Sequence, residues 1–236
     1  MTVSKWSHIA MLGGDPWVLP LWNAINDCIR EGRVVKPSPF FYQVGMSISI
    51  RFDMLPIIVD RINQEAIKLY SRYKNVDSKY VYEKNKEARA FNVDDELTYS
   101  LIIDINSLLF ETNAVWELIK NLIQNVYHHF NFDIPGNLGK HTQSLLRAQI
   151  DQGWFDFMDK NRNYFLHEGT PYIAVDLTNA DQSKYDLLIM KENLHHFEDK
   201  EKYIALSEIN NMVRGFFEAR MIVRDHLIKK IREFRQ

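Results

Sequence analysis

A long run of apolar residues at helical spacing, between Asp95 and about Phe130, constrains this chain more than any other feature. Steps of four and three residues separate its apolar positions, as in a bundle or coiled-coil seam. The main stripe consists of Leu101, Ile105, Leu108, Thr112, Val115, Ile119, Leu122 and Val126. A second stripe beside it consists of Ile102, Leu109, Trp116, Ile123 and Phe130. A helix with two apolar stripes must contact more than one neighbour, so the sequence predicts a helical bundle, with Asp94 or Asp95 as the cap of this helix.

Shorter apolar patterns predict the remaining elements. Further helices are expected at Leu19–Arg30, Asp53–Tyr73, Thr142–His167 and Lys200–Phe234. Pro56 would then lie in the first turn of its helix, where proline is tolerated. Alternating residues in Tyr172–Leu177 and Tyr185–Met190 predict a β-hairpin. We expect a turn at Phe132–Gly139 and a loop or solvated helical extension at residues 74–92.

These elements predict one mainly all-α domain that spans residues 1–236. Its first 45 residues are expected to be irregular apart from one short helix. Residues 46–236 would form the bundle, with the hairpin at about 172–190 inserted before the last long helix. Glycine (9) and proline (7) are scarce, which argues against a many-stranded sandwich. The length and the 46% hydrophobic content are sufficient for one well-buried core.

Charge and cysteine content exclude several functional classes. The net charge is −2, so any binding of nucleic acid must use a local patch. Cys28 is the single cysteine, so neither an intramolecular disulfide nor a cysteine-based zinc site is expected. Residues 1–12 lack the apolar core of a secretory signal, and no apolar window is long enough for a membrane span. We therefore expect a cytoplasmic protein without a membrane partner.

The end of the helix predicted at Thr142–His167 carries residues suited to RNA chemistry. Asn163 and His167 lie one helical turn apart and share a face, and Arg162 can reach them from one side. A histidine can take a proton from a 2′-hydroxyl or give one to a leaving oxygen near neutral pH. An arginine offers several donors to phosphate oxygens, and the asparagine can orient either group. This chemistry requires no metal or cofactor.

The sequence Arg-Asn-x-x-x-His at Arg162–His167, at a helix end in an all-α bundle, resembles the signature of the HEPN superfamily (higher eukaryotes and prokaryotes nucleotide-binding). The resemblance implies a homodimer in which two copies of the motif face each other across a cleft. Many members are metal-independent ribonucleases that act as toxins, defence effectors or RNA-processing factors. Other members only bind partners, including nucleotidyltransferases. The hairpin and the long N-terminal region depart from the minimal bundle and suggest a larger bacterial branch.

Other candidate residues carry weaker signals. Tyr164 is the aromatic residue near the motif that we expect to be exposed and able to stack on a base. The histidine pairs at 128–129 and 195–196 are expected to be surface residues. Three carboxylates of the long helix are interpreted either as a solvated face or as including a buried partner for Arg162: Asp104, Glu111 and Glu117. The last helix carries a basic set that is either an RNA-backbone patch or a group of cations favoured at a helix C-terminus: Arg220, Arg224, Lys229, Lys230, Arg232 and Arg235.

The leading hypothesis is a metal-independent endoribonuclease of HEPN type that cleaves RNA in a dimer cleft. His167 would transfer the proton, and Arg162 with Asn163 would hold the phosphate. The alternative is a non-catalytic helical module that binds a protein partner, such as an antitoxin or a nucleotidyltransferase, or a nucleotide. A third interpretation is a structural dimer in which the motif is a coincidence.

Overall fold

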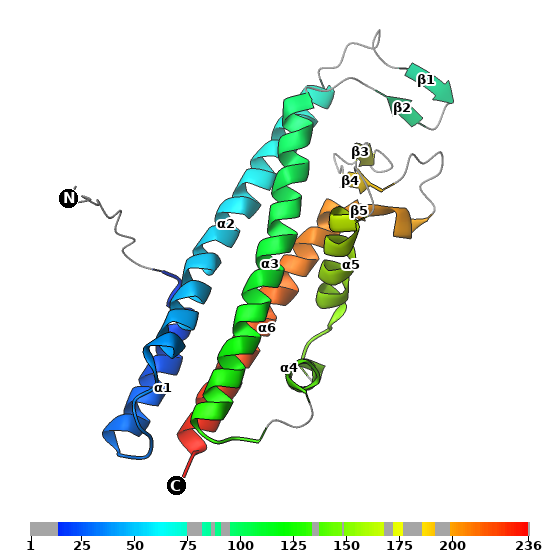
Figure 1. The fold of residues 1–236 in the computed structure, drawn as a ribbon. Coiled ribbons are helices and arrows are strands. Elements are labelled where there is room, and N and C mark those ends of the chain that lie inside the picture. Colours follow the sequence, from blue (N-terminus) through cyan, green and yellow to red (C-terminus); the bar gives the residue numbers. More distant parts are fainter. Residues whose placement is uncertain are drawn as a thin grey trace, which may run out of the picture.

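The computed structural model shows a mainly helical protein with a small antiparallel sheet near one end (Figure 1). It describes residues 14–235 except 75–81, 86–87, 91–94, 134–136, 148, 168–171, 177–185 and 192–198. The α-helices are α1 (Leu19–Arg30), α2 (Pro39–Lys74), α3 (Asp95–His129), α4 (Leu138–Arg147), α5 (Gly153–His167) and α6 (Leu206–Glu233). The strands are β1 (Tyr82–Asn85), β2 (Ala88–Ala90), β3 (Tyr172–Asp176), β4 (Asp186–Met190) and β5 (Tyr203–Ala205). Single 3-10 turns lie at Pro16–Val18 and Lys200–Lys202.

Helices α2 and α3 are the longest elements and lie side by side in antiparallel directions (Figure 1). Both predicted stripes are buried except for Ile102, which is half-buried, and this confirms the bundle. Polar contacts also join the pair, because Arg61 forms a salt bridge to Asp104 at 2.8 Å and Arg51 forms one to Glu111. Helix α6 packs against α1 and α3, and its Phe216 contacts Phe52 of α2, while α5 packs against both α3 and α6. Trp116 of α3 therefore contacts aromatic side chains of both α5 and α6.

Helix α2 begins at Pro39, well before the predicted start at Asp53. Pro56 consequently lies inside the helix, and the prediction that it occupies the first turn is wrong. The apolar stripe continues upstream through Phe41, Val44, Ile48 and Phe52, all of which are buried. Pro39 stands at the helix start, where its missing N–H costs nothing. Residues 39–45 thus belong to the bundle and not to an irregular N-terminal region.

The single helix predicted at Thr142–His167 is in fact two helices, α4 and α5. Helix α4 closes where the backbone N–H groups of Gln149 and Ile150 both donate to the carbonyl of Leu146. The Asp151 side chain then accepts the N–H of Gly153 at 3.1 Å, at the start of α5. This side-chain cap offers the backbone an alternative to helical pairing, and the chain changes direction there.

The predicted hairpin is confirmed, with Tyr172 opposite Met190 and Asp176 opposite Asp186. A third strand, β5, pairs with β4 and occupies residues that we predicted to open the last helix. Helix α6 starts at Leu206 instead, where the Glu208 carboxylate accepts the N–H of Ala205 at 3.0 Å. Strands β1 and β2 form a separate antiparallel pair within residues 74–92, where a loop or helical extension was predicted. Within the part of the chain that the structure describes, no helix is long and apolar enough to cross a membrane.

Candidate functional site

The predicted motif lies in the last two turns of α5, and packing at the other end of this helix holds it in place. Trp154 contacts Trp116 of α3 and Phe216 of α6, with ring centroids 5.2 and 5.8 Å apart. Met158, one turn further along, is completely buried. At Gly215 of α6, a Cβ atom would lie 2.7 Å from the Cβ of Trp154. This glycine therefore allows α5 to approach α6 closely.

Arg162 is half-buried and lies against its own helix. Its Nη2 donates hydrogen bonds to the Asp159 and Asn163 side chains, both at 3.0 Å. Its side chain is 23% exposed. Its Nε is buried and makes no hydrogen bond to any described residue. The Asp159 carboxylate thus offsets the charge of the guanidinium, and the Asn163 side-chain oxygen accepts from the same nitrogen.

His167 is the last residue of α5, and its side chain is exposed. Among the described residues, the hydrogen bonds of Arg162 go to Asp159 and Asn163, and none goes to His167. Positions 162 and 167 are about 140° apart around a helix with 3.6 residues per turn. Within one chain, a hydrogen bond therefore joins Arg162 to Asn163, while Arg162 and His167 lie on different sides of the helix.

Tyr164 is buried, so the prediction of an exposed stacking ring is wrong. It is 7% exposed, and its hydroxyl donates to the Lys191 carbonyl at 2.8 Å. The Lys191 ammonium also lies 5.3 Å from the centre of the Tyr164 ring. The tyrosine fastens the end of α5 to the residue that follows β4, and its role in the structure is to position the motif helix.

The carboxylates of α3 have partners other than Arg162. Asp104 is 2% exposed and pairs with Arg61, so the interpretation of a solvated face is wrong for this residue. Glu111 pairs with Arg51, and Glu117 pairs with Lys120 on its own helix at 2.5 Å.

Several cations of the basic set on α6 contribute to the packing of the bundle. Arg220 forms a salt bridge to Asp15 at 3.0 Å. Its guanidinium lies 4.2 Å from the centre of the Phe52 ring and 4.4 Å from that of Phe217. Arg224 pairs with the neighbouring Asp225. Contacts within the protein therefore account for the positions of Arg220 and Arg224, and neither position requires a bound RNA.

The surface prediction for the histidine pairs holds for His128, which is exposed. His129 is instead half-buried against Phe41, and burial lowers its pKa. Residues 195–196 lie outside the described residues. Among the residues that the structure describes, no three histidine, cysteine or acidic side chains gather as metal ligands would.

The buried side chains of Tyr127 and His141 and the half-buried His226 form a cluster that joins α3, α4 and α6, and the sequence analysis missed it. The Tyr127 hydroxyl lies 2.8 Å from Nε2 of His141 and 3.1 Å from Nε2 of His226. One phenol can donate to one imidazole and accept from the other, so neutral histidines satisfy both contacts. Burial lowers the pKa of both histidines, with a further contribution from nearby Lys230, and it raises the pKa of Tyr127 to about 12. No local pattern could reveal residues so far apart in the chain.

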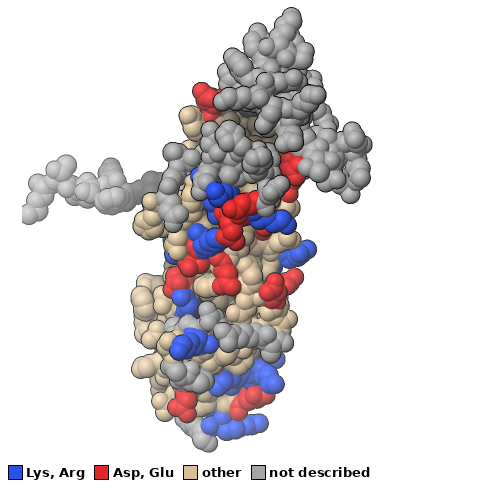
Figure 2. Space-filling model, turned by 90° about the vertical axis from the view of Figure 1, so that its right-hand side faces the viewer, with Lys and Arg blue, Asp and Glu red and all other residues tan. Residues whose placement is uncertain are grey.

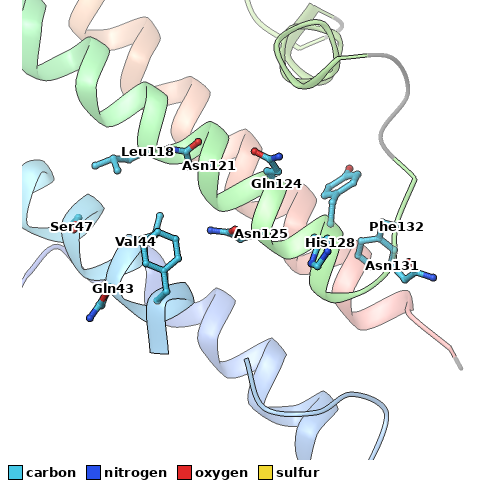
Figure 3. A pocket seen from close by; sticks show the side chains of 12 residues that line it. Gln43, Val44, Ser47, Leu118, Asn121, Gln124, Asn125, His128, Asn131 and Phe132 are labelled. Carbon is cyan, nitrogen blue, oxygen red and sulfur yellow. The ribbon is translucent and has the colours of Figure 1, made fainter. Parts of the chain in front are cut away.

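A groove between the first turns of α2 and the last turns of α3 is the other feature that the sequence analysis missed (Figure 3). Its volume is about 800 Å³. Figure 3 shows Gln43, Val44 and Ser47 on the α2 side and Asn121, Gln124, Asn125 and His128 on the α3 side. Leu118, Phe40, Tyr127, Asn131 and Phe132 complete the lining.

Comparisons of this chain with models of protein families, with curated proteins and with solved structures found no match.

Proposed function

We propose that this protein is a metal-independent endoribonuclease of HEPN type that acts as a homodimer. The observation that carries the proposal is the arrangement at the end of α5. There the exposed His167 follows, one turn later, the hydrogen-bonded pair of Arg162 and Asn163. Anchoring of α5 through Trp154 and Tyr164 supports it, because a rigid helix presents a catalytic group with a defined position.

In the proposed reaction, the RNA 2′-oxygen attacks the adjacent phosphorus and the bond to the 5′-oxygen breaks. A base must remove the 2′-hydroxyl proton, and an acid must protonate the departing 5′-oxygen. Each chain supplies one His167, so two chains facing each other supply both groups. Arg162 would turn from Asp159 towards the phosphate, where its donors stabilise the charge that develops on the nonbridging oxygens.

Surface charge argues against tight nonspecific binding of RNA. Figure 2 shows Lys and Arg side chains interspersed with Asp and Glu side chains on the face seen from the right of Figure 1. The net charge is −2. Since nonspecific affinity for nucleic acid rises with the number of neutralised phosphates, we expect weak nonspecific binding of RNA.

The test is cleavage of single-stranded RNA by purified protein in the presence of a metal chelator. The variants His167→Ala and Arg162→Ala should each lower the cleavage rate by at least about a hundredfold, because general acid–base catalysis contributes roughly 10²–10⁴. His128→Ala is the matched control, since His128 is an exposed histidine near the end of α3. Unchanged cleavage by the His167 variant would refute the proposal, as would cleavage that requires a metal.

The second candidate function is a non-catalytic module that binds a protein partner or a nucleotide. The internal hydrogen bonds of Arg162 to Asp159 and Asn163 favour it, because they resemble those of a structural arginine. It predicts that the wild-type protein leaves RNA intact. It also predicts that Arg162→Ala lowers the unfolding free energy by about 1 kcal/mol, the usual contribution of a hydrogen bond to a charged group near the surface.

A further inference from the structure

The groove between α2 and α3 is lined by neutral side chains. None of its twelve lining residues is an aspartate, glutamate, lysine or arginine. A charged ligand in this groove would lose hydration, and no side chain of opposite formal charge lines the groove to compensate for that loss. The groove favours an uncharged occupant.

Amide side chains supply most of the hydrogen-bonding capacity of the groove. Gln43 lies on α2, while Asn121 and Asn125 lie on α3 (Figure 3). Among the described residues, none of these three side chains forms a hydrogen bond with another residue. Each amide presents a donor and an acceptor side by side. Their complement is a group that also offers a donor next to an acceptor, such as the N–H and C=O of a peptide backbone.

The spacing of these side chains matches an extended chain. Asn121 and Asn125 are four residues apart on α3, and Gln43 and Ser47 are four apart on α2, so each pair is separated by about 6 Å along its helix. Along one edge of an extended chain, an N–H and C=O pair recurs every two residues, or about 6.6–6.8 Å. Both walls of the groove therefore carry polar side chains at nearly the repeat of a strand placed between them.

Apolar residues lie between the two polar walls. Val44 is buried at 6% exposed, and Leu118 is half-buried. Two rings lie at the end of the groove where α2 begins and α3 ends, namely Phe40, which is 64% exposed, and Phe132, which is half-buried. Leu118 to His128, the last lining residue on α3, spans about 15 Å at 1.5 Å per residue, which is the length of about four to five extended residues.

We propose that this groove binds an uncharged segment of another protein in extended conformation. The amides of Asn121, Asn125 and Gln43 pair with its backbone, and alternate apolar side chains of the segment contact Val44, Leu118 and the two phenylalanines. The His167 motif lies about 30 Å away along the bundle, counted in both directions from the Trp116–Trp154 contact. The site is therefore independent of the proposed ribonuclease activity, and either can fail without the other.

The test uses a blocked heptapeptide of alternating serine and leucine, titrated at neutral pH and millimolar concentration into the full-length protein. Heteronuclear NMR of the side-chain NH₂ groups should show shifts for Gln43, Asn121 and Asn125. The same peptide with alternate backbone nitrogens methylated lacks the donors on one edge, so its binding should be at least about tenfold weaker.

Two variants complete the experiment. The double variant with Asn121→Ala and Asn125→Ala should weaken binding by at least about tenfold, since it removes the exposed amide of Asn121 and the half-buried amide of Asn125 from one wall. Asn211→Ala is the matched control, because Asn211 is an exposed asparagine on α6 outside the groove. The proposal is overturned if the peptide causes no shifts, if N-methylation or the double variant leaves the affinity unchanged, or if adenosine or maltose binds the groove more tightly than the peptide.

Discussion

The close approach of α5 to α6 at Gly215 makes a sharp prediction about stability. In Gly215→Ala, the added Cβ would lie 2.7 Å from both Cβ and Cγ of Trp154. Rotation of the tryptophan ring cannot relieve this contact, because the position of a Cβ atom is set by the backbone. The two helices must move apart by several tenths of an ångström.

The expected change in the free energy of unfolding combines two destabilising effects and one stabilising effect. Overpacking of a well-packed interface typically costs about 1–3 kcal/mol. Separation of the helices also weakens the contacts of Trp154 with Trp116 and Phe216, each of which is worth about 0.5–1.5 kcal/mol when intact. Replacing glycine by alanine inside a helix stabilises that helix by about 1 kcal/mol, which offsets part of the loss. We expect a net loss of about 2 kcal/mol in the free energy of unfolding.

Urea denaturation followed by tryptophan fluorescence measures this loss, and in a chain of this size it corresponds to a Tm lower by about 4–8 °C. Asn211→Ala is the control, since it improves helix propensity at an exposed position of α6 and should raise stability by a few tenths of a kcal/mol. A Gly215→Ala protein as stable as the wild type, or more stable by about 1 kcal/mol, would refute the tight α5–α6 contact.

Two further predictions concern buried polar groups. Burial lowers the pKa of His141 and His226 in the folded state, so the unfolded chain binds more protons at low pH. The free energy of unfolding should therefore decline as the pH falls below about 6.5, by up to 1.4 kcal/mol per pH unit for each histidine. Urea unfolding between pH 7.5 and 5 measures this slope, and an equal slope in His141→Asn would contradict the assignment. Arg61→Ala should cost about 2–3 kcal/mol because it leaves the carboxylate of Asp104 buried without its partner. Adding Asp104→Asn should recover most of that loss, and a single-variant effect below about 0.5 kcal/mol would argue against a buried Asp104 carboxylate that depends on Arg61.

Local periodicity explains which parts of the fold were predictable. Helix α3 was predicted nearly to its ends because its stripes are continuous, and the β3–β4 hairpin was predicted because its alternation is local. Strand β5 was missed because it exists only through pairing with β4, a contact between segments distant in the chain. Pro56 is a local signal that was misjudged, because the helix passes through it. Asp151 is one that was overlooked, because its side chain caps the start of α5 and separates this helix from α4.

Apolar periodicity is a property of the chain alone, and it was enough to predict the helical bundle. The order of Arg162, Asn163 and His167 is likewise a property of the chain, and it was enough to single out these residues as a motif. Tertiary structure decided how those residues are used. It buried Tyr164 against Lys191 and gave Asp104 the partner Arg61. It also brought together the Tyr127 cluster and the groove between α2 and α3. The physical reason is that burial and hydrogen-bond partners depend on which helix faces meet, and residues from different helices meet only in the folded protein.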